Sequence, residues 1–321
     1  MENRFDMPNP KRELREFAFH QHIRAANDKL GEDVLIPPGD DMGMVKIGGE
    51  HVLAAVDQCV VGRHCRPDAP LRAVGRKAVL RNLSDVAAMA ARPVAILASA
   101  TLTAGTTEAD AEELYEGLRT TGAEYGAPLI GGDLSMHADP DDPIVVSVTI
   151  LARPALPEGR VIRRNGMQPG DLLAVTGMLG GSLGSDGGGH HLDFQPRIEE
   201  AIQLGNTMGN DLVAMIDLSD GLASDAQRLI ESNQTPMRCI LNTADLPIRD
   251  GLDWTRAVGD GEDYELLFAC RQTPPRELNG LPVTVVGCIE SHDPNLGTVL
   301  ARTDAGLVDL SGLGWEHGAD S

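Results

Sequence analysis

Aromatic and cationic residues are both scarce in this 321-residue chain. Aromatics make up 3% of it, so its cores must be built from Ala, Val, Leu and Ile. Lys and Arg number 27 against 48 Asp and Glu, which gives a formal net charge of −21. This balance argues against non-specific binding to nucleic acid or to anionic membranes, because both depend on cationic patches.

Cysteine pairs and long apolar runs are also missing. The five cysteines include no Cys-x-x-Cys pair, which is typical of a protein in a reducing cytoplasm. The longest apolar stretch, residues 86–102, is interrupted by Arg92 and Pro93 and is too short in each part to span a bilayer. We therefore expect a cytoplasmic protein with neither a membrane nor a nucleic-acid partner.

Strand-like and helical segments alternate along the whole chain, which predicts an α/β fold (α+β, with mixed sheets). Apolar runs on both sides of Gly48-Gly49 predict a hairpin. The Pro- and Gly-rich segment 153–159 predicts a boundary between two α/β domains, an N-terminal one at residues 1–153 and a C-terminal one at 154–321.

The helical segment 73–91 contains Asn82-Leu83-Ser84-Asp85, a sequence that is typical of a helix start. We therefore expect a division of this helix, with Ser84 or Asp85 as the cap of its second part.

Aspartates gather at turn signals beside the apolar runs. There are seven of them, at positions where each carboxylate is expected at the edge of a sheet: Asp40, Asp41, Asp57, Asp85, Asp133, Asp217 and Asp220. Any one of them alone is most often an ordinary turn or helix cap. Together they favour a cluster that holds Mg²⁺, because a hard cation prefers oxygen and shares carboxylates with water and phosphate.

The usual phosphate-binding motifs are absent. The chain has no Walker A loop, no Gly-x-Gly-x-x-Gly after a first strand and no kinase His-Arg-Asp loop. The glycine-rich segment 177–184 follows a predicted strand and could bring backbone N–H groups close to an anion. A tight packing turn explains it equally well.

Six motifs then occur in a fixed order over nearly the whole chain. They are Gly-Asp-Asp at 39–41, Asn-Leu-Ser-Asp-Val-Ala-Ala-Met at 82–89, Ile-Gly-Gly-Asp at 130–133, Arg-Asn-Gly-Met-Gln-Pro-Gly-Asp at 164–171, Ile-Asp-Leu-Ser-Asp-Gly-Leu at 216–222 and Gly-Glu-Asp-Tyr-Glu-Leu-Leu-Phe at 261–268. In these motifs the chain resembles the thiamine-monophosphate kinase family, part of a superfamily with aminoimidazole ribonucleotide synthetase and selenide, water dikinase.

The resemblance implies a two-domain architecture like that of aminoimidazole ribonucleotide synthetase. Its N-terminal domain would carry the metal sites and the sheet of a homodimer, and its C-terminal domain would cover ATP and several Mg²⁺. The implied reaction is ATP- and Mg²⁺-dependent phosphorylation of thiamine monophosphate to thiamine diphosphate. Because a phosphate monoester is already largely dianionic near neutral pH, such an acceptor needs no general base.

The same resemblance implies roles for individual residues. All seven aspartates would be metal ligands, with Asp40 beside the others, and Asp133, Asp220 and Arg164 would act in catalysis. Gly132, Asp133, Arg164 and Ser219 would contact ATP, and His64, Glu262 and Trp315 would face the thiamine phosphate.

The chain departs from the family mainly on the acceptor side. Ala55-Val56 precedes Asp57 where the family carries a hydroxyl pair, Cys65 follows His64 where it carries Phe, and Gly318 replaces another Phe. If the hydroxyl pair orients a metal or its water, Val56→Thr is expected to lower the Mg²⁺ requirement. Two alternatives stay open: an ATP-dependent enzyme with a different small anionic acceptor, and a non-catalytic nucleotide-binding homologue.

Overall fold

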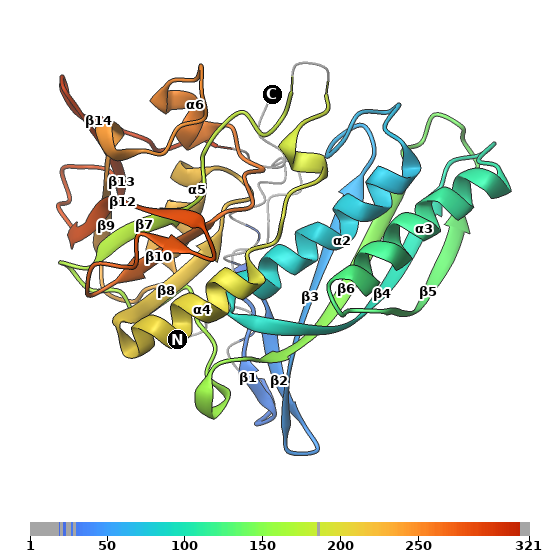
Figure 1. The fold of residues 1–321 in the computed structure, drawn as a ribbon, viewed down its shortest axis with the longest axis horizontal. Helices are drawn as coiled ribbons and strands as arrows, with labels where there is room; N and C mark the ends of the chain where they lie inside the picture. The colour runs from blue at the N-terminus through green and yellow to red at the C-terminus, as the bar shows by residue number, and fades with distance from the viewer. Residues whose placement is uncertain (1–18, 20–21, 24–26, 28–29, 185–186, 315–321) are drawn as a thin grey trace, which may run out of the picture.

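The computed structural model describes the chain except residues 1–18, 20–21, 24–26, 28–29, 185–186 and 315–321. Strands and helices alternate in both halves, so the mixed α/β fold is confirmed (Figure 1). The first half comprises β1 (Val34–Ile36), β2 (Gly43–Ile47), β3 (Glu50–Val60), α2 (Leu71–Ala88), β4 (Ala91–Leu102), α3 (Glu108–Glu124), β5 (Leu129–Met136) and β6 (Val145–Pro154).

The second half comprises more and shorter elements. In chain order they are the 3₁₀ turn η1 (Pro157–Gly159), β7 (Leu172–Thr176), η2 (His190–Leu192), α4 (Ile198–Met208), η3 (Gly209–Asp211), β8 (Leu212–Asp217), α5 (Leu222–Glu231), β9 (Met237–Asn242), η4 (Thr243–Asp245), α6 (Trp254–Gly259), β10 (Leu266–Cys270), β11 (Glu277–Leu278), β12 (Leu281–Ser291), β13 (Val299–Thr303) and β14 (Gly306–Asp309).

The first sheet has the strand order β1-β2-β3-β6-β4-β5. The predicted hairpin joins β2 to β3, and Ile47 pairs with Glu50 across a two-residue turn. Gly48 and Gly49 both have positive φ, 59° and 97°, which a two-residue turn of this kind requires and glycine adopts without strain. The turn therefore fixes how β3, the strand that contains Asp57, pairs with β2.

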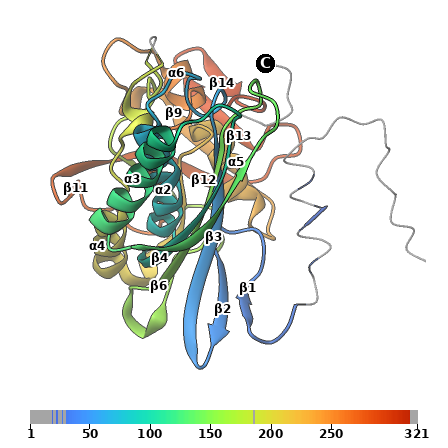
Figure 2. The same cartoon turned by 90° about the vertical axis from the view of Figure 1, so that its right-hand side faces the viewer.

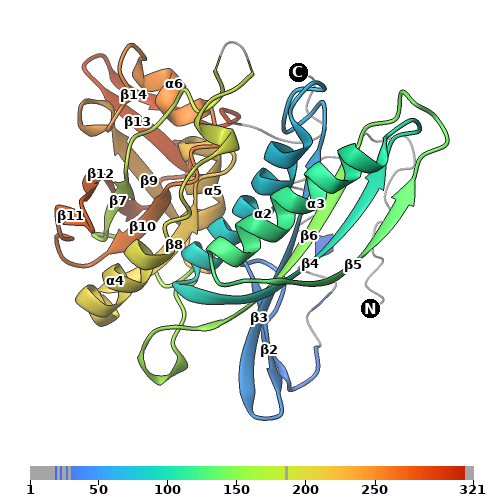
Figure 3. The same cartoon turned by 45° about the vertical axis from the view of Figure 1, so that its right-hand side comes forward.

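Helix α2 lies at the centre of the molecule, between the two sheets (Figure 3). It runs unbroken from Leu71 to Ala88, so the predicted division at residues 82–85 is wrong. Ser84 does not cap a helix because its hydroxyl donates instead to the Asp217 carboxylate, at 2.7 Å. Twelve of the eighteen helix residues are buried, which fits a helix that packs on both sides.

The second sheet has the main order β14-β13-β9-β12-β7-β10-β8 and separates two cores. Alternate residues of β10 show this: Leu266 and Phe268 pack with α2, whereas Leu267 and Ala269 pack with α5 and α6. A short strand with apolar residues at every position is typical of burial on both faces. The molecule is thus layered as first sheet, central helices, second sheet and outer helices.

The first core draws residues from both halves of the chain. Leu53 and Val79 from the first half pack in the same cluster as Leu204 and Phe268 from the second. The last strand of the first sheet ends at Pro154, close to the predicted boundary. The division at 153/154 into two domains stays a prediction.

The face of the first sheet that points away from α2 and α3 carries no helix of the described residues (Figure 2). Val56 and Leu97 lie on this face and are 63% and 37% exposed. We call it the outer face. No helix in the described part of the chain is long and apolar enough to cross a membrane.

Candidate active site

Three of the predicted aspartates meet at the centre of the molecule. Asp41 follows β1, Asp85 lies in the last turn of α2, and Asp217 is the last residue of β8. One carboxylate oxygen from each lies within 4.8 Å of the others. We call these three residues the acidic cluster. Segments from both halves of the chain thus supply one set of oxygen ligands.

The acidic cluster is electrostatically unfavourable as it stands. Burial, and then repulsion from Asp57 and Asp217, raises the pKa of Asp85 well above its ordinary range. Burial and repulsion from Asp41 likewise raise the pKa of Asp217 to about 7. A divalent cation between these oxygens would offset the repulsion and stabilise the ionised carboxylates, and an all-oxygen carboxylate set is the chemistry that Mg²⁺ prefers. The donor set therefore fits such an ion.

Asp40 and Asp41 are bound by arginines from the second half. Arg163 Nε donates to Asp40 at 3.0 Å, and the backbone N–H of Arg164 donates to the same carboxylate at 3.2 Å. The Arg164 guanidinium pairs with both oxygens of Asp41, at 2.6 and 3.1 Å. This turn therefore joins the two halves, and Arg164, predicted to contact ATP, lies directly beside the cluster.

Asp57 and Asp220 flank the acidic cluster, each beside an arginine. Burial raises the pKa of Asp57, Arg81 opposes the rise, and repulsion from Asp220 adds to it. Asp220 pairs with Arg228, which also contacts the fully buried Asp225 at 3.1 Å. Sequence reasoning missed Asp225, although an acidic residue in the first turn of α5 is a recognisable signal.

A second set of predicted residues lines a pocket of about 130 Å³ next to the cluster. We call it the acceptor pocket. Its lining includes His64 and Glu262, expected on the acceptor side, and also Ser219, expected at ATP, and Asp220, expected at a metal. The other lining residues are Arg63, Arg81, Leu183, Asp260, Gly261 and Tyr264. His64 Nδ1 accepts the N–H of Val60 at 2.9 Å, so the neutral ring carries its proton on Nε2. Trp315 lies outside the described residues.

Lys77 holds one wall of this pocket. It is completely buried, and its ammonium donates to both carboxylate oxygens of Glu262 at 2.8 Å and to the carbonyl oxygen of His64. It also lies 2.7 Å from Nδ1 of His191. Although burial opposes it, hydrogen bonds from His191 and Lys77 lower the pKa of Glu262 to about 2. Glu262 is therefore ionised near neutral pH and is only a weak base.

The wall residues missed by sequence reasoning share one helical stripe. Lys77, Arg81 and Asp85 follow one another at intervals of four along α2, so they lie on the same face of the helix. Three charged residues at this spacing on one face of a largely buried helix are a signal that could have found Lys77 and Arg81.

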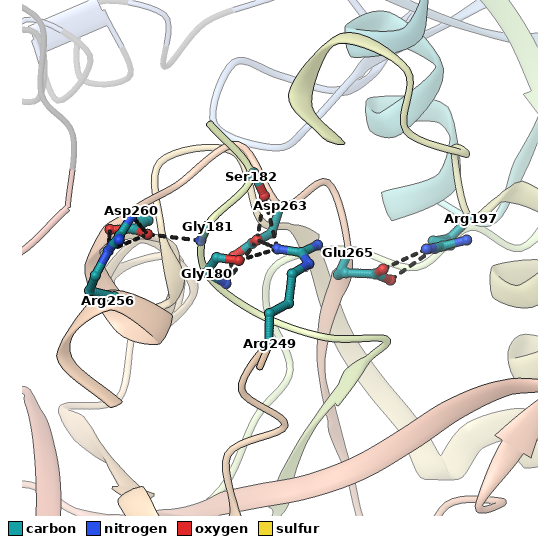
Figure 4. Close-up of polar contacts among 9 residues, drawn as sticks. All are labelled: Gly180, Gly181, Ser182, Arg197, Arg249, Arg256, Asp260, Asp263 and Glu265. Atoms are coloured by element: carbon teal, nitrogen blue, oxygen red, sulfur yellow. Dashed lines mark hydrogen bonds and ion pairs between the residues drawn. The ribbon is translucent and has the colours of Figure 1, made fainter. Parts of the chain in front are cut away.

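The glycine-rich segment 177–184 is a packing turn. The N–H groups of Gly180 and Gly181 donate to the carboxylates of Asp263 and Asp260, at 3.0 and 2.8 Å (Figure 4). Ser182 and Arg249 donate to the same Asp263 carboxylate, each at 2.6 Å. Because the protein's own carboxylates take these donors, the reading of this loop as an anion site is wrong for Gly180 and Gly181.

Asp133 does not join the acidic cluster in this chain. Strand register places Asp57 level with Val148, Ala98 and Gly132, so these residues share the face that points to α2. Asp133, the next residue, therefore points to the outer face. Gly132 is required where it is, because a Cβ there would lie 1.9 Å from the carbonyl oxygen of Ala98.

A larger pocket opens between α3 and β5, with a volume of about 500 Å³. Its lining includes Gly132, Asp133 and, on α3, the half-exposed Tyr115, which sequence reasoning did not single out. We call it the edge pocket, since β5 is an edge strand of the first sheet. An apolar concavity with an aromatic side chain is suited to a nucleoside.

Known proteins of similar sequence and shape share this architecture. A family model described as AIR synthase related protein, N-terminal domain, matches residues 39–153. A thiamine-monophosphate kinase from Rhodopirellula baltica is 33% identical over 295 residues, 85% of this chain and 88% of the relative. A thiamine-monophosphate kinase from Escherichia coli K12 is 30% identical over 319 residues, 89% and 92% of the two chains.

Solved structures show the same fold. The structure of AaThiL complexed with AMPPCP and TMP covers 98% of this chain and 99% of its own, with a TM-score of 0.77 and 24% sequence identity. At that identity the likeness establishes the fold of the chain, and the sequence relatives establish its family.

Proposed function

Because the chain belongs to the thiamine-monophosphate kinase family, we propose that it transfers the γ-phosphoryl group of ATP to thiamine monophosphate, giving thiamine diphosphate and ADP. The observation that carries this proposal is the acidic cluster next to the acceptor pocket. Asp220 lines that pocket and repels Asp57, whose carboxylate is in turn repelled by Asp41 of the cluster. A phosphate ester in the pocket would thus face phosphates held at the cluster.

The transfer needs no proton acceptor from the protein. An oxygen of the acceptor phosphate attacks the γ-phosphorus, a new P–O bond forms, and the bond from the γ-phosphorus to the bridging oxygen breaks as ADP leaves. The attacking oxygen is already ionised near neutral pH. Positioning and charge neutralisation then supply most of the rate, which agrees with the low basicity of Glu262.

Asp41, Asp85 and Asp217 would hold Mg²⁺, with Asp57 and Asp220 within reach as further ligands. Bound Mg²⁺ would neutralise the polyphosphate and the negative charge that develops on it. Asp40 is occupied by Arg163 and Arg164 and would orient its neighbour Asp41. On the acceptor side we keep His64, Glu262 and Trp315 as the residues that face thiamine monophosphate, and a cytoplasmic location stays our prediction.

We further propose that the protein is a homodimer and that Asp133 acts in the site of its partner. The outer face exposes Val56 and Leu97, and the edge strand β5 exposes Ile130, Leu134 and Met136. An exposed apolar sheet face and edge favour pairing with a second chain. Such pairing would bring the edge pocket and Asp133 of one chain toward the acidic cluster of the other, with ATP between them.

The activity is tested with purified protein, ATP, Mg²⁺ and thiamine monophosphate, with thiamine diphosphate and ADP measured together. We expect equal amounts of both products and complete loss with EDTA. ADP formation without thiamine diphosphate, or transfer only to another small phosphate ester, would contradict the proposed acceptor while leaving the phosphotransfer chemistry in place.

The shared site is tested by mixing two inactive variants, Asp85→Asn and Asp133→Asn, and allowing subunits to exchange. In a mixed dimer one of the two sites would contain both native aspartates, so the mixture should recover about a quarter of wild-type activity. If each chain used its own Asp133, no site in the mixture would be complete and activity would stay at the level of the single variants.

A further inference from the structure

Arg81 is a charged side chain that the protein itself leaves incompletely bonded. It lies on the same face of α2 as Lys77 and Asp85, its side chain is 16% exposed, and it lines the acceptor pocket. Its buried Nε has no hydrogen-bond partner among the described residues. The carboxylate paired with it belongs to Asp57, and the Nε–Oδ2 distance of 3.9 Å is too long for a hydrogen bond.

The other carboxylate near Arg81 is already engaged. Both oxygens of Glu262 accept from Lys77 at 2.8 Å, and one of them lies 3.0 Å from His191. Arg81 is thus attracted by Asp57 and Glu262 without bonding closely to either. A buried donor left without an acceptor is unfavourable, and the Arg81 side chain belongs to the lining of a cavity that can hold a ligand.

We propose that Arg81 binds the phosphate group of the acceptor, and this inference rests on the proposed function. The guanidinium is planar and offers parallel N–H donors that match two oxygens of a phosphate. Arg81 lies 3.9 Å from Asp57, which flanks the acidic cluster, and lines the acceptor pocket together with Glu262. A phosphate bonded to it would occupy the position from which its oxygen can attack.

The surrounding charges favour such a residue. The acceptor pocket is lined by the cations Arg63 and Arg81 and by three acids, Asp220, Asp260 and Glu262, and the acidic cluster lies beyond Asp57. A dianionic ester entering this field would be repelled unless a cation received it. Lys77 cannot do so because its ammonium is buried and already donates to Glu262 and His64.

The experiment compares the affinities of thiamine monophosphate and thiamine for the wild-type protein, Arg81→Gln and Arg81→Lys, by calorimetry in the presence of Mg²⁺ and a non-hydrolysable ATP analogue. Loss of a charged hydrogen bond to phosphate should weaken thiamine monophosphate binding by about 10- to 100-fold in Arg81→Gln. The affinity for thiamine, which lacks the phosphate, should be unchanged, and Arg81→Lys should bind with intermediate affinity because it keeps the charge without the fork.

A matched control is Arg76→Gln, which removes the same charge from the same helix. Arg76 pairs with Glu124 and Asp193, away from the acceptor pocket, so its loss should leave the affinity for thiamine monophosphate nearly unchanged. Thermal unfolding of each variant checks folding. Equal weakening of thiamine and thiamine monophosphate, or no weakening of either in a folded Arg81→Gln or Arg81→Lys, would overturn the proposal.

Inorganic phosphate serves as a probe that does not depend on the identity of the acceptor. We expect it to bind the wild-type protein more tightly than Arg81→Gln. Phosphate binding that depends on Arg81, in a protein that binds neither thiamine compound, would contradict the proposed acceptor and support the phosphate site. Equal phosphate affinity in both proteins would overturn the role of Arg81.

Discussion

Asp217 and Asp263 are both buried carboxylates. Asp217 ends β8 and Asp263 precedes the neighbouring strand β10, yet the two differ in how many hydrogen bonds they accept. The Asp263 carboxylate accepts hydrogen bonds from Arg249, Ser182 and the backbone N–H of Gly180, at 2.6 to 3.0 Å (Figure 4). The Asp217 carboxylate accepts one side-chain hydrogen bond, from the Ser84 hydroxyl, and otherwise faces Asp41 and Asp85 in the acidic cluster.

The segment around Asp263 shows what a structural carboxylate requires. Glu265 is held by Arg197 from two nitrogens and by Thr176, and Asp260 is held by Arg256 and Gly181. These contacts, together with stacking of Tyr264 on Phe194 at 3.8 Å, fasten the region after the glycine-rich turn. The carboxylates around Asp263 are paired internally and therefore maintain the fold, whereas Asp85 and Asp217 repel one another and are available to a cation.

The largest expected effect that tests this comparison is the loss of activity in Asp85→Asn. Removing one oxygen anion that would hold Mg²⁺ should lower kcat/KM by about 100-fold or more. Since the pKa of Asp85 is raised by burial and by like charges, the neutral side chain should leave the metal-free protein as stable as before or more stable. Steady-state kinetics and metal-free thermal unfolding measure the two effects, and a strongly destabilised variant would show that Asp85 is structural.

Asp263→Asn should show the reverse pattern. The change weakens the pairing with Arg249 while keeping the side-chain shape, so we expect a destabilisation of about 2 kcal/mol in urea unfolding. Activity of the remaining folded protein should fall far less than in Asp85→Asn. A variant of normal stability without activity would remove the distinction between the two groups of carboxylates.

Sequence reasoning located the aspartates of the cluster because each stands in a local motif. The motif 216–222 ends a strand, and the structure places Asp217 at that strand end as expected. It could not show that Ser84 would bond Asp217, because that contact joins residues 133 apart. The predicted break in α2 is wrong for this reason. The Ser84 hydroxyl, which looks like a local helix cap, bonds a residue far away in the sequence.

A local motif also does not show to which face of the sheet a strand residue points. Asp133 and Asp57 were both assigned to one metal site, but register across four strands puts them on opposite faces of the first sheet. Likewise, the partner of Lys77 lies 185 residues away. The fold class could be predicted from the alternation of elements, whereas these contacts depend on how the two sheets pack around α2.

The dependence of stability on pH offers a smaller test of the same comparison. Because the pKa of Asp217 is about 7 in the folded protein against an ordinary 3.8, the folded state binds its proton more tightly than the unfolded state does. Its contribution to stability should therefore be full below pH 4 and decline as the pH rises through 7 in metal-free protein. Asp217→Asn should flatten this decline, and added Mg²⁺ should raise the midpoint most at high pH. An unchanged profile in Asp217→Asn would contradict the raised pKa.

The smallest expected effect concerns the two residues before Asp57. The sequence-based expectation that Val56→Thr restores a metal-orienting hydroxyl is wrong for the chain's own cluster, because Val56 lies on the outer face. Ala55 pairs with the buried Ile150 and shares the inner face with Asp57.

We therefore expect Ala55→Ser to lower the Mg²⁺ concentration for half-maximal activity by about twofold to fivefold, the scale of one weak hydrogen bond. Val56→Thr is the matched control, since it adds the same hydroxyl to the opposite face of the same strand, where water can bond it. Val56→Thr should change neither the Mg²⁺ dependence of activity nor the thermal unfolding midpoint of the monomer. If Val56→Thr lowers the Mg²⁺ requirement and Ala55→Ser does not, the hydroxyl acts on the outer face, and the cation that it serves lies between two subunits.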